Sequence, residues 1–208
     1  MQVETTPLAG VLLLTPDVFG DARGYFLESW NQRRFAASIG VPEDALAPFV
    51  QDNQSRSCRG VLRGLHYQVE PEPQAKLVRC VAGEIFDVAV DLRRDSATFG
   101  QWTGALLSGT NHRQLWVPVG FAHGFLTLSD TADVLYKTAG FWDRSCERAI
   151  RWNDPELAIA WPTDALEGGE PLLTGKDAEA PTLAEALAAG SVFNGSVVNG
   201  SVVNGASA

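Results

Sequence analysis

The segment from Gly60 to Gln68, GVLRGLHYQ, places a histidine and an arginine inside a run of apolar residues and glycines. Lys76 follows eight residues beyond its end. Histidine titrates near neutral pH, and charged groups cost free energy in an apolar strand, so this pattern indicates binding or catalysis rather than packing alone. Other elements of the chain must hold His66, Arg63 and Lys76 in place.

The composition is that of an ordinary globular protein. A chain of 208 residues, 45% of them hydrophobic and 20% charged, is long enough for one domain with a sizeable core. It has no apolar stretch of the roughly 18 residues that cross a membrane and no signal-peptide pattern, so we expect a cytoplasmic protein without a membrane partner. The net charge of −9 disfavours a nucleic-acid partner, which requires a broad basic surface.

The three cysteines lack the pattern of a disulfide framework or a structural zinc site. Cys58, Cys80 and Cys146 are odd in number and have no CxxC spacing. We expect all three to be reduced.

The pattern of hydrophobic residues predicts a mainly β fold. From Phe49 to about Tyr136, short apolar runs are separated by glycine, proline, asparagine or aspartate, near residues 77–82, 85–92, 102–107, 114–117, 124–128 and 133–137. In Ile85–Leu92 the apolar set alternates with a second set that includes Asp87. Such spacing predicts a β-sandwich or barrel, and the absence of GxGxxG and of a P-loop disfavours a nucleotide site of those types.

Helices are expected only at the periphery. Asn31 is placed to cap a short helix that ends at Gly40, and Thr182 with Glu185 forms a capping box before a second helix that ends at Gly190. The repeated Asn-Gly-Ser-Val-Val sequence that follows predicts a mobile, low-complexity tail over 191–208. We therefore expect one domain over residues 1–190.

His123 ends the segment PVGFAH, whose P-x-G-x-x-H spacing resembles the second motif of the cupin superfamily. Metal-binding cupins usually supply an H-x-H pair and a glutamate from their first motif, whereas the matching segment here reads His66-Tyr67-Gln68. The resemblance therefore implies a cupin-type antiparallel β-barrel, or jelly roll, that holds no metal. Its interior pocket would still be available to a ligand.

Further segments resemble the dTDP-4-dehydrorhamnose 3,5-epimerase family, over roughly residues 5 to 185. In chain order they are Arg23-Gly24 with Phe26 and Glu28, Gln51-Asp52-Asn53, GVLRGLHYQ, Ala75-Lys76, Gly83-Glu84-Ile85-Phe86-Asp87-Val88, the Pro-x-Gly-x-x-His segment, Leu135-Tyr136-Lys137 and Lys176-Asp177. The strength of the resemblance lies in many motifs in one order, not in any single one.

The resemblance implies an isomerase that epimerises C3, C5 or both of a dTDP-4-keto-6-deoxyglucose without a cofactor. Both carbons flank the C4 ketone, so one base, one acid on the opposite face and positive charge near the ketone oxygen suffice. His66 matches the family's general base, Asp177 the carboxylate that orients it, and Tyr136 the acid.

Other positions match the family's ligand contacts. Lys76, Arg63 and His123 would surround the ketone oxygen. Contacts to the nucleotide or sugar match Arg23, Phe26, Glu28, Gln51, Asn53, Arg63, Glu147 and Lys176. The resemblance also implies a homodimer that exchanges N-terminal strands, so that Arg23 can reach the partner's site.

The chain departs from the family six residues after Tyr136, where most 3,5-epimerases have a second tyrosine and this sequence has Trp142. An indole can stack on a base or sugar but has only an N–H donor, so any proton-handling role there is lost.

The sequence leaves open whether C3, C5 or both carbons are inverted. It also leaves two rivals, a 3,4-ketoisomerase and a non-catalytic sugar-nucleotide-binding cupin, and the set His66, Lys76, Tyr136 and Asp177 favours the epimerase over both.

One feature of the expected strand conflicts with a shared pocket. Side chains alternate between the two faces of a strand, which places Arg63 opposite His66. If both line one pocket, the strand must bend or bulge at Gly60 or Gly64, or Arg63 must lie at the mouth. The third histidine, His112, is expected in a solvated loop.

Overall fold

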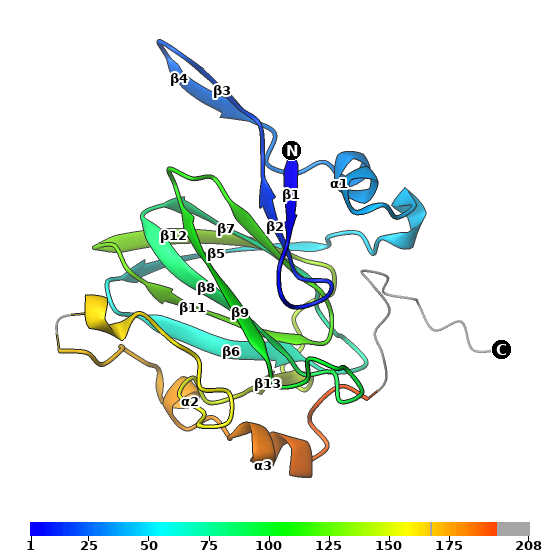
Figure 1. The fold of residues 1–208 in the computed structure, drawn as a ribbon, viewed down its shortest axis with the longest axis vertical. Helices are drawn as coiled ribbons and strands as arrows, with labels where there is room; N and C mark the ends of the chain where they lie inside the picture. The colour runs from blue at the N-terminus through cyan, green and yellow to red at the C-terminus, as the bar shows by residue number, and fades with distance from the viewer. Residues whose placement is uncertain (167, 195–208) are drawn as a thin grey trace.

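The structure is a computed structural model and describes residues 1–166 and 168–194. Two antiparallel sheets face each other as a barrel, short helices pack outside it, and a hairpin projects from one end (Figure 1). This arrangement confirms the predicted antiparallel cupin-type fold.

The strands fall into two large sheets and one hairpin. The first sheet has the order β1 (Gln2–Thr5), β2 (Leu12–Thr15), β10 (Gln114–Val117), β7 (Lys76–Ala82), β12 (Thr131–Thr138) and β5 (Gln51–Cys58). The second has the order β13 (Glu147–Ala149), β6 (Leu62–Gln68), β11 (Phe121–Thr127), β8 (Glu84–Asp91) and β9 (Trp102–Ser108). The hairpin pairs β3 (Val18–Asp21) with β4 (Gly24–Leu27).

Alternate residues of the strands fill the barrel. The interior core includes Val78 of β7, Ile85 and Ala89 of β8, Phe125 of β11 and Val134 of β12. Because side chains alternate along a strand, the polar residues two positions away from these core residues face the same interior. The interior of the barrel therefore contains both an apolar core and a region lined by polar side chains.

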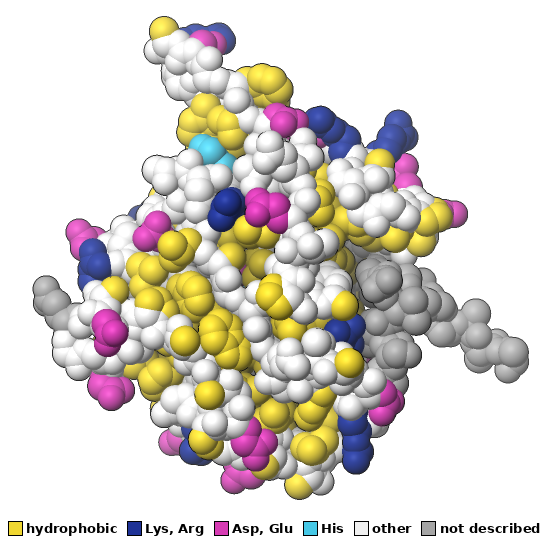
Figure 2. Space-filling model, in the orientation of Figure 1, with side chains coloured by type: hydrophobic (Ala, Val, Ile, Leu, Met, Phe, Trp, Pro, Cys, Tyr) yellow, Lys and Arg dark blue, Asp and Glu magenta, His cyan; other side chains and the backbone are white. Residues whose placement is uncertain are grey.

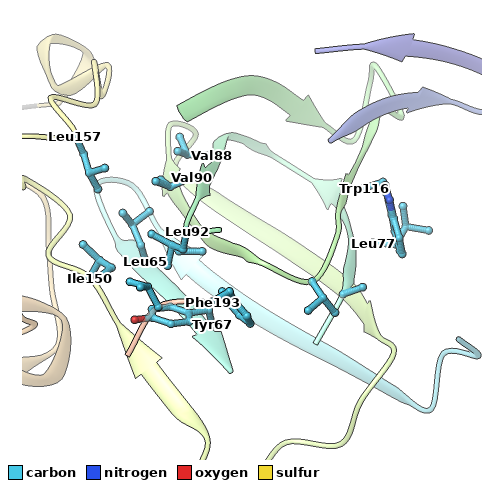
Figure 3. Packing of buried hydrophobic residues seen from close by; sticks show 14 of the residues in the cluster. Leu65, Tyr67, Leu77, Val88, Val90, Leu92, Trp116, Ile150, Leu157 and Phe193 are labelled. Atoms are coloured by element: carbon cyan, nitrogen blue, oxygen red, sulfur yellow. The ribbon is translucent and has the colours of Figure 1, made fainter. Parts of the chain in front are cut away.

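A second cluster of buried residues covers the outside of both sheets. Leu65 and Tyr67 of β6 lie with Ile150 and Phe193 on one sheet, while Leu77 and Trp116 lie on the other (Figure 3). The alternation predicted for β8 is confirmed, since its other set of apolar residues belongs to this outer cluster. Because β6 and β8 are packed on both faces, their backbones are held in place, and so are the side chains that they direct into the barrel.

The helices are short, as predicted. They are α1 (Gln32–Ile39), α2 (Gly175–Ala178), α3 (Leu183–Ala188) and the 3-10 turns η1 (Glu43–Ala45) and η2 (Thr163–Ala165). The side chain of Asn31 caps α1, and Gly40 ends it with a φ of 73°. The capping box of Thr182 and Glu185 is present at α3.

The packed part of the chain extends past the expected boundary at residue 190. The Tyr67 hydroxyl donates to the Ser191 carbonyl over 2.8 Å, and the Phe193 amide donates to the Leu92 carbonyl over 3.1 Å. Val192 and Phe193 are buried. Residues 191–193 therefore pack against the barrel, and residues 195–208 of the expected tail lie outside the described residues.

The β3–β4 hairpin stands away from the barrel, with apolar side chains at its base (Figures 1 and 2). Its exposed apolar residues are Val18, Phe19, Tyr25 and Phe26. His112, expected in a solvated loop, lies in the loop between β9 and β10, is partly buried, and packs its ring against Tyr25 at 4.7 Å between centroids. Cys58, Cys80 and Cys146 are all free. In the part of the chain that the structure describes, no helix is long and apolar enough to cross a membrane.

Candidate active site

A β-bulge in β6 brings Arg63 and His66 to the same face. Arg63 pairs with Phe125 of β11 and His66 pairs with His123, so two residues of β6 lie between positions that only Gly124 separates on β11. Simple alternation would place the side chains of Arg63 and His66 on opposite faces of β6. The extra residue of the bulge brings them to the same face. Of the alternatives that the sequence left open, a bend at Gly60, a bend at Gly64 or Arg63 at the mouth, the structure has the bend at Gly64, whose φ is +131°.

Only glycine fits on either side of this bulge. A Cβ atom on Gly64 would lie 2.5 Å from the Cα atom of Gly124, and one on Gly124 would lie 2.7 Å from the carbonyl oxygen of Arg63. The positive φ of Gly64 adds a backbone requirement of its own. These two glycines let the strands approach closely enough to keep the bulge.

His66 is held by a buried carboxylate from a distant segment. Its Nε2 lies 2.6 Å from Oδ1 of Asp177, which belongs to α2 and is 3% exposed at its side chain. The hydroxyl of Thr174, the residue that caps α2, donates to the other oxygen of Asp177 over 3.0 Å. Burial alone would raise the pKa of Asp177, but the hydrogen bond and charge of His66 outweigh it, so its pKa lies below the ordinary value.

Lys76 is buried close to the same histidine. Its Nζ donates to the carbonyl oxygen of His66 over 3.2 Å. Burial lowers the pKa of Lys76 to about 8, against the opposing charges of Asp87 and Glu147. The side chain of Lys76 therefore loses its positive charge at a pH just above neutral.

His123 forms a second histidine–carboxylate pair inside the barrel. Its Nε2 lies 2.7 Å from Oδ1 of Asp87, and both side chains are buried. Asp87 faces inward because it shares a face of β8 with Ile85 and Ala89. Since His123 pairs directly with His66 across β11 and β6, the two histidine–carboxylate pairs lie side by side.

Tyr136 reaches the interior from the opposite sheet. It follows Val134 on the inner face of β12 and is partly buried against the interior core. Burial raises the pKa of its phenol, Glu147 raises it further, and Arg63 lowers it. The Nε of Arg63 donates to the hydroxyl of Ser57 over 3.1 Å, which fixes one edge of the guanidinium group.

His66, Lys76 and Tyr136 line a cavity of about 100 Å³. Its lining residues are Gln51, Asn53, His66, Tyr67, Gln68, Gln74, Lys76, Tyr136, Trp142 and Glu147. The structure thus brings together His66, Lys76 and Tyr136, three of the four residues predicted to be catalytic, and the fourth, Asp177, contacts His66 from behind.

The rim of the cavity carries amide groups, an aromatic ring and an ion pair. The Gln51 amide nitrogen donates to Asn53, and its oxygen accepts from the backbone N–H of Trp142 over 3.0 Å. Lys176 Nζ lies 2.6 Å from a carboxylate oxygen of Glu147. Burial would raise the pKa of Glu147, but the hydrogen bond and charge of Lys176 hold it below the ordinary value.

Not every predicted contact lines this cavity: Arg63, His123 and Lys176 are not among its lining residues, and Arg23, Phe26 and Glu28 lie elsewhere. Arg23 is 89% exposed and pairs with Asp21 at the hairpin, and Phe26 is exposed on β4. Glu28 pairs with Arg34 of α1 over 3.1 Å. Within one chain, therefore, the structure does not bring Arg23, Phe26 and Glu28 to the residues that line the cavity.

Several supporting residues were not singled out from the sequence. Thr174 holds Asp177, Asp87 holds His123, and Ser57 holds Arg63. The Thr-x-x-Asp spacing of residues 174–177 is a capping signal that could have revealed the first pair. The amide of Gln68, which occupies a cupin metal-ligand position, donates instead to the carbonyls of Glu72 and Phe141.

The arrangement suits proton transfer next to a group that becomes negatively charged. A histidine oriented by a carboxylate can accept a proton, a phenol on the facing sheet can donate one, and buried cations can stabilise an oxyanion. Over residues 1–166 and 168–194, no three His, Cys, Asp or Glu side chains are grouped to hold a metal ion.

Comparisons with known proteins give a consistent result. The sequence model of the dTDP-4-dehydrorhamnose 3,5-epimerase family matches residues 5–185. The chain is 54% identical over 186 residues to the dTDP-4-dehydrorhamnose 3,5-epimerase of Pseudomonas aeruginosa, covering 89% of this chain and 98% of the relative. It is 42% identical over 190 residues to a dTDP-4-dehydrorhamnose 3-epimerase of Streptomyces niveus, covering 91% and 87% respectively.

A solved structure shares both the fold and much of the sequence. It is a dTDP-6-deoxy-D-glucose-3,5-epimerase from Legionella pneumophila in complex with dTDP-4-keto-L-rhamnose. The two chains are 44% identical with a TM-score of 0.85, and the match covers 94% of this chain and 98% of the other.

Proposed function

Because this chain belongs to the dTDP-4-dehydrorhamnose 3,5-epimerase family, we propose that it inverts carbons beside the C4 ketone of a dTDP-4-keto-6-deoxyglucose. It is an isomerase of sugar nucleotides, and the comparisons favour neither a ketoisomerase nor a non-catalytic binding protein. The observation that carries the proposal is the cavity shared by His66, Lys76 and Tyr136, with Asp177 behind His66.

In the proposed reaction His66 removes a proton from a carbon next to the ketone. Asp177 accepts a hydrogen bond from Nε2–H, which leaves the lone pair on Nδ1 for the substrate and stabilises the imidazolium that forms. The electron pair of the broken C–H bond moves onto the C4 oxygen, giving an enolate. No redox step is needed, and we propose that the reaction uses no cofactor.

The enolate must be stabilised and then reprotonated on its other face. Lys76, Arg63 and His123 supply positive charge or N–H donors to the C4 oxygen. Tyr136 then delivers a proton to carbon from the facing sheet, its phenol kept protonated by a raised pKa. The electron pair returns from oxygen to form the new C–H bond, and the carbon is inverted.

The ligand's nucleotide would lie at the rim. We propose that Gln51 and Asn53 bind the nucleotide, that Trp142 stacks on the thymine ring, and that Lys176 with Glu147 binds near the diphosphate. Trp142 is 54% exposed beside the cavity, so its ring is available for such stacking. Either carbon or both could be inverted, because relatives that invert both and one named as a 3-epimerase are similar over most of the chain.

The proposal includes a homodimer whose exchanged N-terminal segments complete each site. The hairpin residues Arg23 and Phe26 do not line the cavity of their own chain, and the hairpin exposes four apolar side chains. Exposed apolar surface of this kind is typical of a protein–protein contact. We place the protein in the cytoplasm, where three free cysteines stay reduced.

Deuterium exchange tests the function directly. The protein is incubated with dTDP-4-keto-6-deoxyglucose in D2O, and deuterium at C3 and C5 is followed by NMR. Incorporation at one or both carbons with inversion is expected, and the position identifies a mono- or a double epimerase. No incorporation at either carbon contradicts the proposal, and movement of the ketone to C3 indicates a ketoisomerase.

A further inference from the structure

Gln68 is a buried glutamine whose side-chain amide holds backbone groups of other segments. The residue is 2% exposed, and its amide nitrogen donates to the carbonyl oxygens of Glu72 over 2.6 Å and Phe141 over 3.0 Å. Its amide oxygen accepts from the backbone N–H of Asp143 over 2.8 Å. Phe141 and Asp143 flank Trp142 in the sequence. One side chain therefore holds the backbone on both sides of the exposed indole ring.

Two further glutamines hold the same loop. Residues 139–146, here called the rim loop, connect β12 to β13. The amide oxygen of Gln51 accepts from the backbone N–H of Trp142 over 3.0 Å, and the amide nitrogen of Gln74 donates to the carbonyl oxygen of Gly140 over 2.9 Å. Side-chain amides therefore do here what the backbone of a neighbouring strand does in a sheet, and they give the rim loop a defined conformation.

Gln68 also connects the rim loop to the strand that carries the proposed base. It follows His66 by two positions on β6, so both side chains point to the same face, and both line the cavity. The carbonyl oxygen of Asp143 accepts from the backbone N–H of Glu147 over 3.1 Å, and Glu147 pairs with Gln68 across β13 and β6. The positions of Trp142 and Glu147 at the cavity are thus both fixed relative to β6.

Loss of this amide would remove three hydrogen bonds at once. Two carbonyl oxygens and one backbone N–H would be left without their partner beside a buried position, which is unfavourable. The rim loop would then shift to bond with water instead. The Trp142 ring is 54% exposed and lies between two of the released groups, so it would move with the backbone.

We propose that Gln68 is a positioning residue that orders the rim loop before the ligand arrives, so that Trp142 and Glu147 receive the nucleotide at a fixed place relative to His66. This inference rests on the proposed epimerase function. Proton transfer in that reaction is the task of His66 and Tyr136, and Gln68 acts on affinity and placement instead. A loop that is already ordered does not have to be ordered at the expense of binding free energy.

The first test is Gln68→Met, which keeps the length of the side chain and removes its donor and its acceptor. We expect the calorimetric Kd for dTDP and the KM for the keto sugar to rise roughly tenfold, because the loop must now be ordered on binding. At saturation kcat should change less than about threefold, since the acid and the base stay in place. Gln101→Met is the matched control, because Gln101 is exposed and does not line the cavity. An unchanged Kd, or a lower kcat with an unchanged KM, overturns the proposal.

A second glutamine of the rim loop tests whether the effect is specific to Gln68. The Gly140 carbonyl accepts from the Thr138 hydroxyl over 2.8 Å as well as from Gln74, so Gln74→Met leaves it one donor. This variant should raise the Kd for dTDP less than Gln68→Met does. An equal or larger rise overturns the proposal, because any change in the cavity wall would then weaken binding. Circular dichroism establishes that each variant is folded.

A double variant tests whether Gln68 acts through the Trp142 ring. The rise in Kd for Gln68→Met/Trp142→Ala should be smaller than the product of the two single rises, because both changes remove the same stacking contact. Rises that multiply fully overturn the proposal, since Gln68 would then act independently of the ring that it is proposed to place.

Amide hydrogen exchange gives a readout that needs neither turnover nor a variant. In the ligand-free wild type the N–H groups of Trp142 and Asp143 should be protected, because Gln51 and Gln68 accept from them. In Gln68→Met the exchange of Asp143 should be roughly tenfold faster or more. Unprotected amides in the free wild type overturn the inference, even if the variants do not fold. The proposed function fails separately, if the wild type puts no deuterium on C3 or C5 of the keto sugar in D2O.

Discussion

At the level of single residues, the proposed reaction divides the tasks of base, acid and oxyanion donor among side chains from different strands. His66 comes from β6, Lys76 from β7, His123 from β11 and Tyr136 from β12. Each is fixed by packing or by a partner, so little reorganisation is needed during the reaction. The separation makes each role testable by a single substitution.

Replacement of the base should abolish exchange while leaving nucleotide binding intact. We expect His66→Ala to lower deuterium incorporation roughly 100- to 10,000-fold, because general-base catalysis is lost. The rim residues that would bind the nucleotide do not depend on His66, so the calorimetric Kd for dTDP should change little. Exchange near the wild-type rate would show that the base is another residue.

The buried lysine should set the basic limb of the pH profile. With a pKa of about 8, Lys76 loses its positive charge as the pH rises through that value, far below the 10.5 of an ordinary lysine. In the proposed mechanism the protonated form of Lys76 stabilises the enolate, so kcat/KM should fall roughly tenfold per pH unit as the pH rises above this pKa. Asp87 and Glu147 raise this pKa, and Lys176 lowers it.

The variant Lys76→Arg provides the comparison for this profile. Arginine stays charged, so its profile should show no decline near pH 8, even if its absolute activity is lower. A wild-type profile that is flat to about pH 10 would contradict the assignment to Lys76.

Trp142 should contribute to nucleotide affinity. Loss of a stacked ring commonly costs about 1–3 kcal/mol per base, so Trp142→Ala should raise the Kd for dTDP by about tenfold or more. The neighbouring Phe141 is similarly exposed but does not line the cavity, which makes Phe141→Ala the matched control. Equal effects of the two substitutions in calorimetry would argue against stacking on Trp142.

At the scale of elements, the bulge between β6 and β11 determines the geometry of the site. It places Arg63 and His66 on one face, and it depends on Gly64 and Gly124. The outer faces of the same strands are packed against the C-terminal part of the chain, as at Leu65 and Ile150. A local error in this strand pair would therefore move the base and disturb the core together.

The substitution Gly64→Ala tests this dependence. A Cβ atom there would lie 2.5 Å from the backbone of β11, and the φ of +131° disfavours alanine. Strain and overpacking together should lower the free energy of unfolding by about 3 kcal/mol, measured in urea. Gly20→Ala is the control, because its nearest atom is at 3.8 Å and the change should be neutral for unfolding. A Gly64→Ala variant as stable and as active as the wild type would contradict the requirement.

At the scale of the whole molecule, the projecting hairpin is the feature that one chain leaves unexplained. It exposes apolar residues and carries predicted ligand contacts away from the cavity, although the body of the protein is otherwise well packed. A second copy that receives the hairpin would account for both observations. In the proposed dimer, the hairpin of each copy would complete the site of the other.

Disruption of the hairpin surface should separate the subunits and reduce activity. We expect the wild type to scatter light as about twice its 22.4 kDa mass and Phe26→Asp to scatter as a monomer, because a buried charge disfavours association. The monomer should retain its fold by circular dichroism but lose most of its activity. Leu106→Asp, on β9 and also exposed, is the control. A fully active monomeric wild type would contradict the exchanged-strand proposal.

Much of the fold could be predicted because it depends on local patterns. The period-two alternation of β8, the cap at Asn31 and the capping box at Thr182 all depend on residues close together in the sequence. The contacts of residues 191–193 could not be predicted in this way. Ser191 to Phe193 looked like the beginning of a tail, but their packing depends on Tyr67 and Leu92, far earlier in the chain.

The family's motifs can be read from the amino-acid sequence, so the histidines, the lysine, the tyrosine and the carboxylate available for chemistry could be identified before the fold was known. Their combination into one site depends on tertiary contacts. Asp87 and His123 are 36 residues apart, and His66 and Asp177 are 111 residues apart. The common face of Arg63 and His66 likewise depends on the register between β6 and β11. Contacts between distant strands follow from how the whole chain packs, and local side-chain patterns do not encode them.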